Sequence, residues 1–91
     1  MQATALEKWM SKPVRRLTDG KIGRVWRRSN IVGWLDVNWV TGAITNMPRR
    51  GMVIISEEEY RVGQALYAEH GMNAFSPEIQ RRARKFPPVP V

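Results

Sequence analysis

Four short turn signals divide residues 13–56 into brief segments, and this spacing constrains the fold more than any other feature of the chain. Between the turns lie five runs rich in strand formers, at 14–17, 21–27, 31–40, 43–47 and 52–55. The turn signals are Asp19-Gly20, Ser29-Asn30, Thr41-Gly42 and Pro48-Arg49-Arg50-Gly51. Because parallel strands need long crossover connections, turns this short require an antiparallel meander.

A strongly twisted five-stranded meander of this size usually closes into a small barrel, since closure removes exposed sheet edges. The two common types are the SH3-like and the OB barrel, and turns this short favour the SH3-like type. We therefore predict a mainly β fold with a C-terminal helix (α+β), in which residues 13–56 form a five-stranded antiparallel SH3-like barrel. At 91 residues the chain is one domain with a small core.

The longest predicted strand, 31–40, has two distinct faces. Leu35, Val37 and Trp39 alternate along one face, which we predict to be the core face. Trp34, Asp36, Asn38 and Val40 then fall on the other face, which we expect to be wet.

The strand at 21–27 follows the Asp19-Gly20 turn, for which we expect positive φ at both residues. Gly23 lies inside this strand, where a missing side chain usually indicates a bulge, a sharp coil or another backbone passing close.

Helical signals flank the predicted barrel. Residues 1–12 favour a short helix or a flexible segment, with Leu6, Trp9 and Met10 on one face. Ser56 with Glu59 at N3 predicts a helix from 56 to about 70, ending at Gly71. Its Tyr60, Leu66 and Tyr67 could dock on the barrel. A 3₁₀ turn over Glu57–Glu59 followed by a last strand is the alternative.

Ser76 and Pro77 predict a second short helix to about residue 85. Residues 86–91 read F-P-P-V-P-V and cannot be helical, so we expect an extended tail. The chain therefore divides into an N-terminal segment (1–12), a barrel with a packed helix (13–75), and a basic helix with a Pro-rich tail (76–91).

The net charge of +7 is unevenly distributed. Residues 12–50 carry a surplus of seven positive charges, 51–75 a deficit of three, and 76–91 a surplus of three. Such a field attracts polyanions. The chain has no cysteine, which excludes disulfides and thiolate metal sites. No apolar run approaches the ~20 residues of a membrane span, and the N-terminus lacks a secretory pattern, so we expect a cytoplasmic protein.

The segment Asp19 to Arg28, D-G-K-I-G-R-V followed by basic residues, resembles the KOW motif. This motif is found in a ribosomal large-subunit protein family and in NusG-type transcription elongation factors. The resemblance covers about a tenth of the chain and implies the first hairpin of an SH3-like barrel. In those families the motif commonly touches RNA or a polymerase. The Gly-Asp that often precedes the first family strand is replaced by Lys12-Pro13.

Ile31 to Trp34, together with Val14-Arg15-Arg16, is similar to segments of the type II dihydrofolate reductases, which are also SH3-like barrels. Their active site uses Val-Gln-Ile-Tyr near the last strands. The matching place here reads Val53-Ile54-Ile55-Ser56 and lacks both the Gln and the Tyr hydroxyl. The shared signal is therefore the fold.

We expect a nucleic-acid surface in which arginines and lysines hold phosphates and tryptophans stack on bases. Eleven Arg against four Lys favours bidentate phosphate contacts. The predicted residues are Arg15, Arg16, Lys21, Arg24, Trp26, Arg27, Arg28, Trp34, Arg49 and Arg50. A partner-binding tail is expected at Arg81, Arg82, Arg84 and Lys85. The alternative is that these cations only keep the surface solvated.

Catalytic patterns are poor, and we predict no enzyme, no metal site and no cofactor. His70 stands at a predicted helix end, where a capping role is the simpler interpretation. Glu57–Glu59 suits a helix start better than a metal site.

The leading hypothesis is thus a nucleic-acid-binding small barrel, with RNA or DNA left open and the oligomeric state undetermined. The first alternative is a protein interaction module, such as a phage or plasmid protein that docks on and regulates a host machine. The second is an oligomeric reductase-like barrel.

Overall fold

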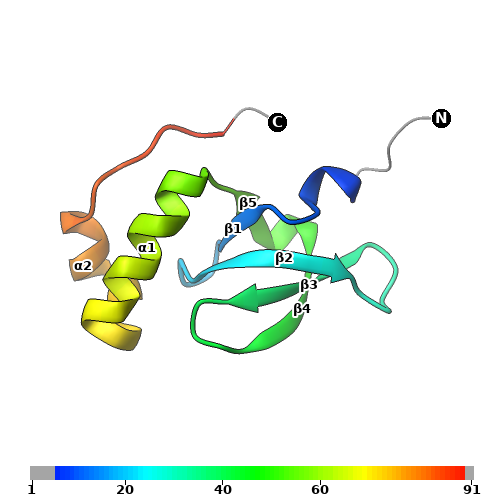
Figure 1. Ribbon diagram of the computed structural model, residues 1–91, viewed down its shortest axis with the longest axis horizontal. Helices are drawn as coiled ribbons and strands as arrows, with labels where there is room; N and C mark the ends of the chain where they lie inside the picture. Colours follow the sequence, from blue (N-terminus) through cyan, green and yellow to red (C-terminus); the bar gives the residue numbers. More distant parts are fainter. Residues whose placement is uncertain (1–5, 90–91) are drawn as a thin grey trace.

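A computed structural model describes residues 6–89 as a five-stranded antiparallel sheet followed by helices (Figure 1). The strands are β1 (Pro13–Arg16), β2 (Ile22–Arg28), β3 (Trp34–Trp39), β4 (Ile44–Pro48) and β5 (Met52–Ile54). The helices are α1 (Glu57–His70) and α2 (Pro77–Arg82), with 3₁₀ turns η1 (Glu7–Trp9), η2 (Arg49–Gly51) and η3 (Gly71–Phe75). The predicted α+β class and the antiparallel strands are confirmed.

The sheet has the order β4-β3-β2-β1-β5 and is open, so the expected closure into a barrel is wrong. Each edge strand pairs with one neighbour: β4 with β3, and β5 with β1. Because β5 contains only three residues, it offers too short an edge for β4 to complete a ring.

The core lies on one face of the sheet and follows the predicted alternation. Leu35, Val37 and Trp39 of β3 are buried, as expected. They cluster with Val14, Val25 and Met52, while Leu6, Trp9 and Met10 of the N-terminal segment pack against this cluster. The predicted N-terminal helix is a single 3₁₀ turn here, and residues 1–5 lie outside the described part of the chain.

Gly23 brings β2 and β3 unusually close together. A Cβ atom at this position would lie 2.6 Å from the Asn38 carbonyl oxygen and 2.8 Å from the Trp39 ring. Gly23 pairs with Trp39 across the ladder, and a bulge between Val25 and Arg27 follows it. The prediction that another backbone passes close to Gly23 is confirmed.

The connecting loops are longer than the predicted two-residue turns. Between β1 and β2, Arg16 N donates to Lys21 O at 2.7 Å, and only Gly20, not Asp19, has a positive φ. The Asp19 carboxylate accepts from Lys21 N instead, so its side chain fixes the turn without a left-handed backbone.

Ile31 and Val32 lie in a loop rather than in the predicted long strand. Ser29 N donates to Trp34 O, and Gly33 has φ of 83°, which ends the loop one residue before β3 begins. The Ser29 hydroxyl accepts from Ile31 N and competes with ladder pairing.

Helix α1 begins and ends where the sequence predicts. The Ser56 hydroxyl accepts from Glu59 N at 3.0 Å, and Gly71 follows with φ of 61°. The alternative of a 3₁₀ turn and a last strand is therefore wrong. Helix α2 has its predicted Ser76 cap and Pro77 start, but it ends at Arg82 instead of 85. Residues 83–89 are not helical, as expected for the tail.

The helices lie at one end of the molecule, with α1 packed across β1 and β2 (Figure 1). Gly63 of α1 touches Ile22 of β2. Tyr67, which was expected to dock on the sheet, instead stacks on Phe75 of η3 with 5.9 Å between ring centroids. The unforeseen η3 turn accounts for this difference because it places an aromatic ring next to α1.

Candidate nucleic-acid interface

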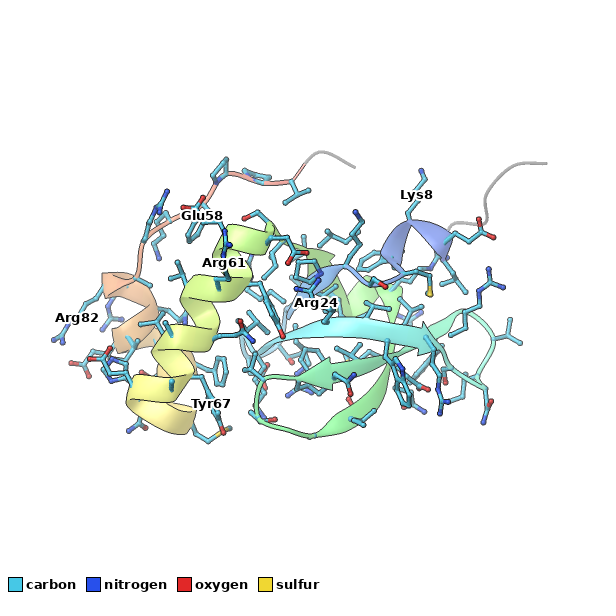
Figure 2. All side chains as sticks on the ribbon, viewed as in Figure 1. Lys8, Arg24, Glu58, Arg61, Tyr67 and Arg82 are labelled. Carbon is cyan, nitrogen blue, oxygen red and sulfur yellow. The ribbon has the colours of Figure 1, made fainter. Side chains whose placement is uncertain are left out.

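Helix α1 covers the half of the outer sheet face where Arg15 and Arg24 lie. Arg24 makes two hydrogen bonds to the Glu57 carboxylate, at 2.6 and 2.8 Å, and its guanidinium lies 4.7 Å from the centroid of the Tyr60 ring. Figure 2 shows Arg24 between β2 and the first turns of α1. Arg15 pairs with Glu59. These two arginines therefore hold the acidic start of α1 on the sheet.

Hydrogen bonding to Arg24 lowers the pKa of Glu57, and the same contact raises the pKa of Arg24. Both groups are thus more firmly charged in the folded chain than they are alone. An external phosphate would have to displace Glu57 to reach Arg24.

Arg16 and Lys21 share the Asp19 carboxylate at the β1–β2 loop. Arg16 donates through Nε at 3.0 Å and through Nη2 at 2.6 Å, and Lys21 Nζ lies 3.9 Å away. The hydrogen bond from Arg16 lowers the pKa of Asp19. Arg16 also lies over the Trp39 ring at 5.0 Å. Its primary contacts are therefore within the fold.

Arg27 and Arg28 also have acidic partners. Arg27 Nε donates to Asp36 at 3.0 Å, and its guanidinium stacks 4.2 Å from the centroid of Trp26, which is 49% exposed. Arg28 pairs with Glu7 at 3.3 Å. The predicted sheet-face arginines are thus not gathered into one uncompensated basic surface.

Arg49 and Arg50 differ from these five arginines. Both side chains are exposed on η2, and within residues 6–89 neither makes an ion pair or hydrogen bond. They line a surface hollow of about 380 Å³ together with Val32, Gly33, Trp34 and Pro48. Trp34 is half-buried there, and it pairs with Pro48 across β3 and β4. Two predicted cations and one predicted tryptophan are therefore brought together.

Sequence reasoning missed Val32, which is 97% exposed at the edge of this hollow. Its β-branched side chain indicated strand, whereas the positive φ of Gly33 was the signal for a loop.

The basic residues of the predicted tail are partly paired. Arg82 bonds to Glu78 at 3.1 Å and Arg84 to Glu58 at 2.6 Å, while Lys85 donates to the Gln80 carbonyl at 2.7 Å. Figure 2 shows Glu58 on the side of α1 next to the tail. The Arg84 pair fastens this stretch to α1.

His70 is the last residue of α1, with Nε2 3.8 Å from Glu69. Among residues 6–89, no group of three or more His, Cys, Asp or Glu side chains is placed to hold a metal ion. No helix in that range is long and apolar enough to cross a membrane.

Comparisons of this chain with protein-family models, with curated proteins and with solved structures give no match. The likeness to KOW proteins and to reductase barrels therefore stays a prediction from the sequence.

Proposed function

We propose that this protein binds nucleic acid through the surface formed by Val32, Trp34, Arg49 and Arg50, which we call the η2 surface. The observation that carries this proposal is the pair of adjacent, uncompensated arginines beside a half-buried tryptophan. Guanidinium groups recognise phosphate through two parallel hydrogen bonds, and neighbouring arginines on one turn can contact successive phosphates.

The charge distribution supports an anionic partner. Every acidic side chain has a basic neighbour within ion-pair distance: seven pair with arginines and Glu69 with His70. The net charge of +7 therefore belongs to cations that the acids do not compensate. Their summed field attracts a polyanion, and at the η2 surface two of them are adjacent in sequence.

The hollow gives the η2 surface more than charge. Trp34 and Pro48 offer apolar contact next to the two guanidinium groups. Aromatic side chains stack on unpaired bases without strong sequence preference, so the arrangement suits contacts to the backbone with a base against Trp34. Trp26, stacked with Arg27 on β2, is a second exposed ring.

A salt titration tests the proposal. A fluorescein-labelled 12-nucleotide strand, as RNA and as DNA, is titrated with protein from about 50 to 200 mM salt by fluorescence anisotropy, and log affinity should fall linearly with log salt. The double variant Arg49→Gln/Arg50→Gln should flatten this slope by about 2.

The matched control is Arg81→Gln/Arg82→Gln, which removes the same charge from two adjacent exposed residues of α2. It should leave the slope nearly unchanged. If wild-type protein shows no binding at about 50 mM salt, the nucleic-acid proposal fails. If both double variants lose affinity equally, net charge and not the η2 surface is responsible.

A second candidate function is a protein interaction module, which the exposed apolar side chains favour. Val32 is 97% exposed, and Ile44 on the edge strand β4 is 56% exposed. An unpaired strand edge with apolar neighbours can accept another chain. Partner capture that survives nuclease treatment and is lost in Val32→Ser/Ile44→Ser would support this alternative.

A further inference from the structure

A second pocket, of about 270 Å³, lies away from the η2 surface, between α1, the η3–α2 segment and the start of β2. Apolar side chains from three elements form its floor: Ile22 of β2, Val62 and Leu66 of α1, and Phe75 of η3. Val62, Leu66 and Phe75 are only half-buried. Apolar surface is thus left open on the inside of the helical end, where an apolar group could cover it.

The pocket size suits a small molecule. A cavity of about 150 Å³ lined by apolar side chains is enough to hold benzene. The pocket here has room for a ring or branched aliphatic group together with a short polar arm. Gly63 contributes to this space, since its missing side chain leaves α1 directly against Ile22.

Cations dominate the polar part of the pocket lining, which contains Arg15, Arg84 and Lys85 against Glu59 as the acid. Arg15 is held by Glu59, and Arg84 by Glu58. Lys85 has a neutral partner instead, because its ammonium donates to the Gln80 carbonyl. An ammonium carries three donors, so Lys85 can donate to an anion as well.

The tail forms one wall of the pocket and limits what can enter. Arg84 lies 4.8 Å from the centroid of Phe86, and Phe86 lines the same pocket. The ion pair to Glu58 fastens this stretch on α1. A folded protein or a nucleic-acid duplex cannot reach the apolar floor past this wall, whereas a small molecule can.

We propose that this pocket binds a small amphipathic carboxylate, with its apolar body against Val62, Leu66 and Phe75 and its carboxylate toward Lys85. The charge of the lining selects an anion, and the apolar floor selects against acetate-sized acids. This inference is independent of the η2 surface.

Phenylacetate is a suitable probe, measured by two-dimensional ¹H–¹⁵N NMR on the full chain. We expect shifts concentrated at residues 62–66, 74–75 and 83–86, with a Kd of about 1 mM or below for a ligand of this size. Phenylacetamide, which keeps the ring but lacks the charge, and acetate, which lacks the ring, should each bind at least about fivefold more weakly.

Two variants test the placement. Lys85→Gln should weaken phenylacetate about fivefold to tenfold while leaving phenylacetamide unchanged. Ala83→Phe, which places a ring into the pocket from its lining, should abolish binding of both probes. Arg82→Gln, an exposed neighbour outside the lining, should change neither.

The proposal is overturned if about 5 mM phenylacetate gives no localised shifts, or if acetate shifts the same amides equally. It is also overturned if Lys85→Gln and Arg82→Gln weaken binding alike, since this would indicate general charge attraction. The spectrum of each variant without ligand shows whether it is folded.

Discussion

Gly63 of α1 lies directly against Ile22 of β2, and there is no room between them for a side chain at position 63. A Cβ atom there would lie 2.1 Å from Ile22 Cδ1 and 3.2 Å from Cγ1. Glycine inside a helix costs about 1 kcal/mol relative to alanine. The close approach explains why α1 nevertheless has glycine at this position.

Gly63→Ala is therefore expected to lower the free energy of unfolding by about 1 kcal/mol, because overpacking of about 1–3 kcal/mol exceeds the gain in helix propensity. In an Ile22→Val background, which lacks Cδ1, the same substitution should instead raise it by about 0.5 kcal/mol. Urea unfolding of the four proteins measures both effects. Equal effects in the two backgrounds would show that this contact is not what excludes a side chain.

Gly23→Ala should be more damaging. The new Cβ would meet the Asn38 carbonyl oxygen at 2.6 Å, and this backbone atom cannot move without disturbing the β2–β3 ladder. We expect a loss of at least about 3 kcal/mol in unfolding free energy, or failure to fold. Gly51→Ala is the control, since its nearest neighbour is the flexible end of Met47 at 3.0 Å, and it should change stability by less than about 1 kcal/mol.

Stability should fall in acid partly through Asp19. Its pKa is lowered in the folded chain, mainly by the hydrogen bond from Arg16, below an ordinary value of 3.8. A lowered folded-state pKa means that the stabilisation is present above the ordinary pKa and is lost as pH falls toward the folded value. Because Asp19 is partly exposed, we expect a contribution below about 1 kcal/mol.

Asp19→Asn should flatten the dependence of unfolding free energy on pH below about 4, while its amide oxygen can still accept from Lys21 N. Glu69→Gln, on an exposed part of α1, is the matched control and should leave the acid limb steeper than Asp19→Asn does. An identical acid limb in wild type and Asp19→Asn would contradict this assignment.

Local chemistry made much of the fold predictable. Ser56 and Gly71 bound α1 because a side-chain cap and a left-handed residue act within one turn. The core face of β3 follows from strict alternation. Barrel closure was not predictable in this way, since it depends on how long β5 becomes and on whether β4 reaches it.

The candidate interface was less predictable than the fold. The run of arginines around β2 predicts a basic face, but pairing with acids distant in sequence decides which cations remain available. Arg24 and Glu57 are 33 residues apart, and only the packing of α1 on the sheet brings them together. Arg49 and Arg50 share a three-residue turn, and no acid approaches them within residues 6–89.

Glu57→Gln separates the η2 surface from the covered sheet face, and this test rests on the proposed nucleic-acid function. The substitution releases Arg24 from its carboxylate partner, but α1 still covers that side of β2, so Arg24 should not reach a phosphate. We therefore expect the slope of log affinity against log salt to equal that of wild type, in contrast to the flattening of about 2 in Arg49→Gln/Arg50→Gln. The anisotropy titration described above measures both variants. A slope steeper by about 1 in Glu57→Gln would mean that Arg24 contacts a phosphate once it is freed. The interface would then extend over the face now held by α1, as the sequence alone predicts.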